Sequence, residues 1–465
     1  MGITSTLSIA AQAMKAQQLA IQTTGHNLAN VATPGFSRQR VDLASAHPSF
    51  EGGVILGQGV EATSVQRIVD RFAEAELLSL NGTLGFSGAQ SQALASIQEI
   101  FPTSGGIDSA LSAFFSALSD LANNPAGLTE RVSVIGKAGA LGASLAQTRQ
   151  SLTSVQQNLD EELRGSSTRV NLLAEQIAAL NTQISTTETT GEPANDFRDQ
   201  RQTLLQELTS LTGATVREDF DGQVNVIAGG LMLVGGARFA SLQSDTLNAN
   251  GLHTIIYRSP DGLNFDASAQ FTAGKMGAIL NMRDVTTQDL IDRLDQFAKT
   301  LIDEINAQHA LGFDLTGGAG GEFFTSLATP AGAAANVHVA AAISADPRLI
   351  AAAAAAGAVP GDNRNAQALV GLQTTNFAAL GGLTLQDSLL GLVGDVGAQA
   401  QKAQARLDFH QALLAQTQAR RESASGVNID EEMTKLIQFQ RAFQASSMLV
   451  RTADDLYQSL LDMVR

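Results

Sequence analysis

The C-terminal stretch from Asn428 to Arg465 constrains the fold most, because its apolar residues recur with the spacing of a long coiled-coil helix. Taken from position 429 in alternating steps of four and three, eight of eleven positions are apolar. Asn428 is suited to cap this helix, and the acidic residues after Ile429 suit the positive end of its dipole. The pattern predicts one helix of about 55 Å. Its apolar seam consists of Ile429, Met433, Leu436, Phe443, Val450, Tyr457, Leu461 and Val464.

Residues 3–28 follow the same alternation at the other end of the chain. The large apolar side chains of this second seam are Ile3, Leu7, Met14, Ile21 and Leu28. Because polar residues interrupt both seams, we expect the two ends to pair with each other and then with further copies of the chain. An ordinary helical hairpin within one chain and a plain coiled-coil dimer fit the same periodicity.

The length and composition exclude several classes of protein. A chain of 465 residues exceeds one typical core, so several domains are expected. With 29 basic and 45 acidic residues the net charge is −16, and an acidic chain without a basic patch is not expected to bind nucleic acid. Cysteine is absent, which excludes disulfides and thiolate metal sites. We expect no cleaved secretory signal and no membrane insertion, because neither apolar pattern is found.

Between the two seams the patterns alternate between helix and strand. Pro34-Gly35 predicts a turn that ends the first helix near position 30, followed by short strands up to position 62. Helical periodicity returns at about 63 and is strongest over 129–187, with a shorter helix at 196–211. Turn residues then punctuate a β meander over 214–275, helices resume at about 285, and a further helix runs over 384–421. The Ala- and Gly-rich stretch 325–382 is expected to hold little regular structure.

This order predicts a mainly α protein with an inserted β region and a nested architecture. Along the chain the terminal helices lie outermost, the long helices lie inside them, and the strands lie innermost. Both termini are therefore expected at one end of the molecule. We expect a terminal coiled-coil domain of residues 1–62 plus 428–465 and a long-helix bundle domain of residues 63–213 plus 284–324 plus 383–427. The third predicted unit is an outer β or irregular domain of residues 214–283 plus 325–382.

Motifs for catalysis and for cofactor or metal binding are not found in the sequence. The six histidines lack metal-ligand spacing, and there is no Walker A sequence. The glycine cluster at 317–321 lacks the strand and helix that a phosphate-binding loop requires. We therefore predict no catalytic, cofactor-binding or metal site, no cofactor, and no enzyme activity. The alternative of an enzyme requires an unrecognised site in 325–382.

Four stretches of this sequence resemble the flagellar axial proteins, the family of rod, hook and hook-associated proteins. The first joins Asn27 and Asn30 to the run Thr33-Pro34-Gly35-Phe36, and its continuation Ser37-Arg38-Gln39 is similar to the hook–filament junction members. The other three lie at 306–324, 361–369 and 425–445. Together with the nested order they extend over the whole chain.

The resemblance implies a structural subunit that joins hook to filament within a helical tube, with its terminal helices lining the inner tube. The alternatives within the family are hook protein and the second hook–filament junction protein. The implied assembly interface comprises both seams together with Asn27, Asn30, Pro34, Gly35 and Phe36.

The resemblance also implies the partners and the destination. The partners are copies of the chain itself, hook protein, the second junction protein, and a cytoplasmic export chaperone on the C-terminal helix. The destination is extracellular, at the hook–filament junction, after export by the flagellar type III apparatus. Many relatives carry a large β insertion where this chain has only the residues between Phe324 and Gly361, so a reduced outer domain is expected.

Overall fold

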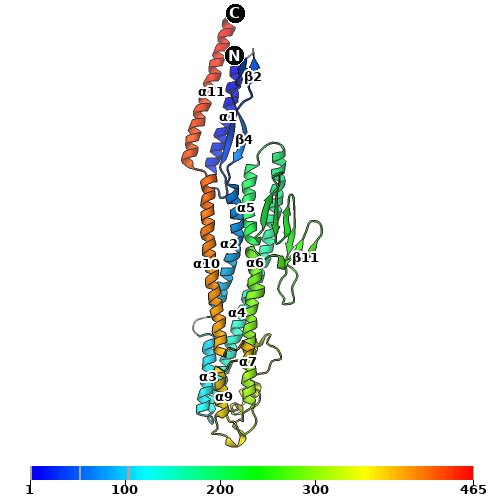
Figure 1. Ribbon diagram of the computed structural model, residues 1–465, viewed down its shortest axis with the longest axis vertical. Helices are drawn as coiled ribbons and strands as arrows, with labels where there is room; N and C mark the ends of the chain where they lie inside the picture. The colour runs from blue at the N-terminus through cyan, green and yellow to red at the C-terminus, as the bar shows by residue number, and fades with distance from the viewer. Residues whose placement is uncertain (1–2, 52–53, 102–104, 464–465) are drawn as a thin grey trace.

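The computed structural model describes residues 3–51, 54–101 and 105–463 and has the form of a long rod with both termini at one end (Figure 1). The protein is mainly helical, with small antiparallel sheets, as the sequence predicts. Two very long helices at the ends of the chain lie side by side, and the longer helical body continues the rod below them. The prediction of both termini at one end is confirmed for the described residues.

The upper part of the rod is the terminal pair, α1 (Ile3–Ala29) and α11 (Ile429–Met463). The two helices run antiparallel, because Asn27 near the end of α1 lies beside Glu432 near the start of α11. A two-stranded sheet of β1 (Gln39–Ser45) and β4 (Val60–Arg67) packs against α1. A short hairpin of β2 (Ser49–Glu51) and β3 (Val54–Leu56) leaves this sheet beside the N-terminus.

The body below is a bundle of long helices. Its main helices are α2 (Arg71–Ile100), α3 (Ile107–Asn123), α4 (Leu128–Thr189), α5 (Asn195–Thr212), α7 (Thr287–Ala310) and α10 (Leu385–Ser425). The α4 helix buries an apolar stripe that includes Leu145, Leu152, Leu163 and Ile177. The sequence predicted this helix to within two residues at each end, because its periodicity extends without a break.

A β subdomain lies on one side of the middle of the rod (Figure 1). One sheet has the order β5-β6-β7-β8, and a second has the order β11-β10-β9. The strands are β5 (Thr215–Glu218), β6 (Val224–Ala228), β7 (Leu231–Gly235), β8 (Arg238–Phe239), β9 (Ser241–Gln243), β10 (Ile256–Arg258) and β11 (Asn264–Asp266). All pairings are antiparallel, as expected for a meander.

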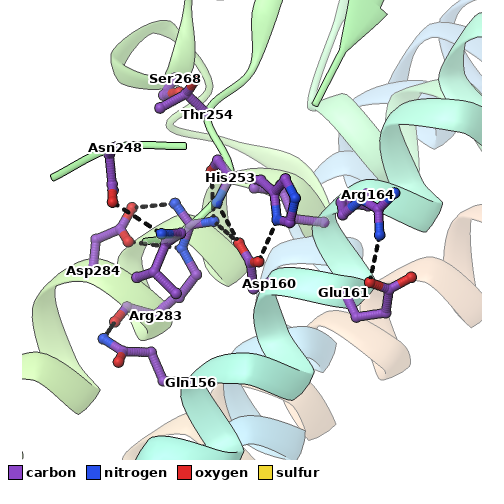
Figure 2. Close-up of polar contacts among 12 residues, drawn as sticks. Gln156, Asp160, Glu161, Arg164, Asn248, His253, Thr254, Ser268, Arg283 and Asp284 are labelled. Atoms are coloured by element: carbon purple, nitrogen blue, oxygen red, sulfur yellow. Dashed lines mark hydrogen bonds and ion pairs between the residues drawn. The ribbon is translucent and has the colours of Figure 1, made fainter. Parts of the chain in front are cut away.

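A buried polar cluster fixes the β subdomain to α4 (Figure 2). Asp160 on α4 accepts hydrogen bonds from the backbone N–H of His253, at 2.9 Å, and from Arg283 Nη1, at 2.6 Å. The His253 Nδ1 atom lies 2.5 Å from the other oxygen of Asp160. Arg283 also donates to the carbonyl of His253 at 2.8 Å, so one arginine ties the loop before β10 to the long helix.

Two helix starts differ from the prediction. Helical structure does not return at 63, because residues up to Arg67 pair with β1, and α2 begins only after Asp70. The Asp70 carboxylate accepts hydrogen bonds from the backbone of Phe72 and Ala73, at 3.0 and 3.1 Å, and so caps the helix. Helices also resume before 285, since α6 (Gly274–Asn281) leads through one π turn (Met282–Thr286) directly into α7.

The stretch 325–382 is more ordered than the sequence predicts and lies apart from the β subdomain. It sits at the lower end of the rod, whereas the β subdomain lies beside the middle (Figure 1). Grouping 214–283 with 325–382 in one outer domain was therefore wrong. The stretch contains α8 (Ala341–Ala345), α9 (Arg364–Gly371) and short 3-10 turns, and it buries Ile343, Ile350 and Leu369. Its alanines and glycines give no periodic signal in the sequence. The segment is held instead by side-chain hydrogen bonds from distant elements, which the sequence does not reveal.

Candidate assembly interface

The inner seam of the terminal pair is built from small residues on α1 and larger ones on α11. Ala10, Ala16 and Ala20 are almost completely buried on α1. The opposing helix α11 buries Glu432 and Ala453, and half-buries several apolar side chains between them. Small side chains on one helix let the backbones approach closely, so the pair needs few large residues to hold together.

The predicted seam of α11 is covered by the chain only over the middle of the helix. Leu436, Phe443 and Val450 are half-buried in the pair. By contrast, Ile429, Met433, Tyr457 and Leu461 are 41–56% exposed. The sequence predicted one continuous seam, but a heptad spacing does not tell how far along the helix a partner covers it.

The outer face of α11 is broader than the sequence predicted. It also carries Ile437, Met448, Leu449, Leu456, Leu460 and Met463, all 47–76% exposed. The sequence contains a signal for this outer face, because these apolar residues fall between the heptad positions of the predicted seam. A long apolar face uncovered in a single chain marks an interaction surface.

On α1 the predicted large side chains are all partly covered. Leu7, Met14, Ile21 and Leu28 are each half-buried, on a helix that packs against α11 and the β1–β4 sheet. The side chain of Ile3, and the whole of Val464, lie outside the described part of the structure.

The turn after α1 attaches the terminal pair to the body. Pro34 is exposed at its tip, and Gly35 follows with φ +84°, a conformation that glycine adopts readily. A Cβ atom on Gly35 would lie 2.6 Å from the Thr203 hydroxyl of α5, so there is no room for a larger residue. The Phe36 ring packs edge-on against His26, with centroids 5.4 Å apart. Arg421 of α10 donates to the Gly35 carbonyl at 2.8 Å.

Asn27 links three segments that are far apart in the sequence. Its side-chain oxygen accepts from the backbone N–H of Gln39 at 2.9 Å, and its amide donates to the Gln39 carbonyl at 2.8 Å. The same amide donates to Glu432 of α11 at 2.9 Å. Asn30, half-buried, instead donates to the carbonyl of His26 at 3.0 Å and closes the end of α1. Asn27 is thus an internal brace of the terminal pair, whereas Asn30 bonds locally at the end of its own helix.

Carboxylates of the body complete this joint. Asp199 on α5 accepts from the Ser37 backbone at 2.8 Å and from Arg67 Nη1 at 2.6 Å. Glu74 on α2 lies 3.6 Å from Arg67 and is 8% exposed. Burial raises the pKa of Glu74 above its usual value, and the neighbouring Arg67 opposes that shift. The joint between terminal pair and body is therefore polar and charged rather than apolar.

At the lower end, the other motif residues form hydrogen bonds that hold the core. The Asn306 side-chain oxygen accepts from the backbone N–H groups of Phe323 and Phe324, at 2.9 and 2.8 Å. Its amide donates to the Phe324 carbonyl at 2.8 Å. Asn365 donates to the Ala351 carbonyl at 2.7 Å and accepts from Gln308 at 2.8 Å. These asparagines hold loops of the lower end in place.

His309 is fully buried at the centre of this region. Its Nδ1 lies 2.8 Å from the Gly321 carbonyl, and its Nε2 accepts from the Ala351 backbone N–H at 2.9 Å. Both nitrogens are occupied in the neutral ring, and burial lowers the pKa of His309. The histidine therefore acts as a structural cross-link between the glycine loop and the segment after 350.

Within the described ranges no cluster of His, Cys, Asp and Glu could hold a metal ion, and no helix there is long and apolar enough to cross a membrane.

Comparisons with known proteins match the chain from end to end. The family described as "Flagellar hook-associated protein FlgK helical domain" matches residues 94–324. The "Flagella basal body rod protein" family matches 7–36, and the "Flagellar basal body rod FlgEFG protein C-terminal" family matches 419–463. The last two matches fall on α1 and on α11 with the end of α10, and the first falls on the body.

Full-length relatives and one solved structure agree with these matches. Flagellar hook-associated protein 1 of Bacillus subtilis is 29% identical over 98% of this chain and 97% of its own. The protein of that name from Escherichia coli is 25% identical over 99% of this chain and 100% of its own. The structure of the flagellar hook junction protein FlgK from Burkholderia pseudomallei has a TM-score of 0.67 at 17% identity, and it covers 76% of this chain and 100% of its own.

Proposed function

The chain belongs to the flagellar hook-associated protein 1 family, and on that premise we propose that it is a structural subunit joining hook to filament in the bacterial flagellum. The observation that carries the proposal is the uncovered outer face of α11. In a single chain this face exposes Met433, Ile437, Leu449, Leu456 and Leu460 to water. An exposed apolar face of this extent marks a surface for contact with another molecule.

We assign the parts of the rod to layers of a helical tube. The terminal pair, 1–62 plus 428–465, forms the inner tube, and its seam residues together with the Pro34-Gly35-Phe36 turn form the contacts between copies. The long-helix body forms the next layer around it. The β subdomain, which protrudes from one side of the body, forms the outer part (Figure 1).

The neighbours follow from the position of the subunit. Hook protein lies on one side of the junction and the second hook–filament junction protein on the other, while copies of this chain lie beside it. This arrangement explains why the terminal pair needs an apolar face on more than one side.

We further propose that the C-terminal helix has a partner before assembly. Export through the flagellar type III apparatus delivers the chain to the extracellular junction, and a cytoplasmic chaperone covers the outer face of α11 until then. An amphipathic helix in a groove is a common mode of such recognition. Titration of the 427–465 peptide with the chaperone tests this step, which fails if the full chain binds and the peptide does not.

We propose that this subunit lacks a segment that its longer relatives carry. The alignment with the E. coli protein extends over 549 positions, whereas this chain has 465 residues. We place the missing residues in the stretch between Phe324 and Gly361, which here forms part of the closed lower end of the rod.

The family consists of structural flagellar proteins, and we propose that this member has no catalytic activity. In 325–382, where a site would have to lie, Asn363 and Asn365 are bonded to the carbonyls of Ala122 and Ala351. Asp362 is paired with Arg364 at 2.9 Å.

Deletion of the gene tests the proposed function directly. Electron micrographs of the deletion strain are expected to show hooks without filaments, and re-expression of the chain is expected to restore the filaments. Hooks that still carry filaments after the deletion overturn the proposal. Loss of the hooks themselves points to hook protein instead.

A further inference from the structure

The α2 helix forms the floor of a long groove in the middle of the rod. The α5 helix and β5 form one wall, and α10 forms the other. The groove holds about 890 Å³, and its residues on α2 run from Arg71 to Gln90, a length of about 28 Å. Leu78 and Phe86 form apolar parts of the floor, with Leu205 and Val216 beside them. We call this surface the α2 groove.

The α2 groove is basic, although the chain as a whole is acidic. Five arginines and two glutamates line it. Arg67, Arg198 and Arg201 are held by carboxylates of the same chain. Arg71 and Arg406 lie exposed at the rims, and neither has an ion pair among the described residues. The groove therefore offers an apolar floor and two free cations to an acidic amphipathic segment.

Such a segment is present at the end of α11. Starting from the bond between Asn27 and Glu432, the antiparallel register places Ile3 level with about residue 456. Residues 457–463 extend past this point, and the C-terminus lies beyond the N-terminus in Figure 1. The extending end is apolar and exposed, with Leu460 at 47%, Leu461 at 56% and Met463 at 76%.

The same end carries unpaired acidic side chains. Asp454, Asp455 and Asp462 are exposed, and none of them has an ion pair within the described ranges. Only Arg451 is basic in the last sixteen described residues of α11, which would extend about 22 Å. The apolar residues and the negative charge of this end match the α2 groove.

The two surfaces cannot meet within one chain. The α2 groove begins just below the joint, where Arg420 of α10 pairs with Glu76. From the joint α11 runs in the opposite direction, and its end lies about 52 Å away.

We propose that the C-terminal end of α11, residues 454–463, occupies the α2 groove of a neighbouring copy of this chain. Its apolar side chains lie on Leu78 and Phe86, and its aspartates face Arg71 and Arg406. Two different surfaces of the same chain then form a head-to-tail contact, which builds a helical assembly when its rotation does not close into a ring. The proposal rests on the proposed function, because both surfaces must be present in one assembly.

Because the chain has no cysteine, paired cysteine substitutions test the contact without background. Ser79, exposed in the groove, and Leu460 on α11 are each replaced in one chain, S79C with L460C. The matched control combines L460C with S133C, an exposed serine near the start of α4. Flagella are isolated from a strain that lacks its own copy of the gene and are then oxidised.

We expect the S79C/L460C chains to form disulfide-linked dimers and higher multimers, and the S133C/L460C chains to remain monomeric. Assembled flagella without multimers above the S133C control overturn the α11 contact and leave the proposed function standing. If the unsubstituted chain does not enter flagella at all, the proposed function fails, and the contact with it.

Charge reversal provides an independent test. Reversing Arg71 and Arg406 to glutamate is expected to reduce incorporation about tenfold, since two attractive contacts become repulsive. Reversing Asp455 and Asp462 to arginine is expected to have a similar effect. Both sets combined in one chain are expected to restore incorporation, and a combination as defective as either set alone overturns the contact.

Discussion

The two ends of the rod differ in how much apolar surface the chain itself buries. At the lower end, Phe114, Phe323 and Phe324 pack together without exposure to water, and the motif asparagines are satisfied within the chain. In the terminal pair, α11 buries only Glu432 and Ala453 among its described side chains. The lower end is thus complete in one chain, whereas the terminal pair has surface left for other copies. The same protein therefore contains a part that folds by itself and a part that assembly completes.

The test of this contrast with the largest expected effect replaces one phenylalanine at each end. Phe324→Ala is expected to lower the free energy of unfolding of the body by about 3–5 kcal/mol, because it opens a cavity in a closed core. Phe443→Ala, in the terminal pair, is expected to leave body unfolding unchanged and to impair incorporation into flagella. Denaturant unfolding followed by circular dichroism measures the first effect, and equal shifts for the two variants would refute the contrast.

A second test compares two asparagines that hold backbone groups. Asn306→Ala leaves the buried N–H groups of Phe323 and Phe324 without a partner, and it is expected to cost the body about 2 kcal/mol. Asn428→Ala removes the cap that accepts from Asp430 at 2.9 Å and is expected to cost α11 about 1 kcal/mol. We expect the free energy of unfolding of the body to fall in the Asn306→Ala variant and to stay unchanged in the Asn428→Ala variant. A shift with Asn428→Ala would mean that the joint transmits stability from the terminal pair to the body.

The third test uses pH. Burial lowers the pKa of His309, so the folded protein keeps this ring neutral while the unfolded chain takes up a proton near pH 6.5. The unfolded state then binds more protons, and the contribution of His309 to stability is complete above about pH 6.5 and decreases as the pH falls. The loss has a limiting slope of about 1.4 kcal/mol per pH unit.

The matched variant is His309→Gln, which does not titrate in this range. We expect the stability of the unsubstituted body to fall more steeply between pH 6.5 and 5 than that of the variant. Parallel curves in unfolding titrations would show that the ring does not remain neutral in the fold.

The smallest effect is expected on the outer surface of the joint. Arg420 is half-exposed and pairs with Glu76 at 2.6 Å on the neighbouring helix. Because solvent screens such a pair, Arg420→Ala is expected to change the free energy of unfolding by less than about 1 kcal/mol. A larger loss in unfolding measurements would place this pair among the contacts that support the body.

Much of the fold could be predicted because its helices carry local signals. The spacing over 129–187 predicted α4, Gly213 marked the end of α5 with a left-handed conformation, and Asn428 marked the start of α11. Missed features depend on distant partners. Pairing with β1 extends β4 to Arg67. Ala351 is held by His309 and Asn365, and no periodic spacing in the sequence indicates that these residues contact it.

The sequence by itself determined the extents of α4, α10 and α11, the nesting of helices around strands and the presence of an apolar seam at each end. These follow from periodicity and capping, which act within one or two helical turns. Only the tertiary structure decided which face of α11 the chain covers and which it leaves open. It also decided that Asn27 joins α1 to β1 and α11, and that 325–382 belongs to the lower end. Those outcomes depend on which residues from distant parts of the chain contact each other. The spacing of residues along the chain does not encode these contacts.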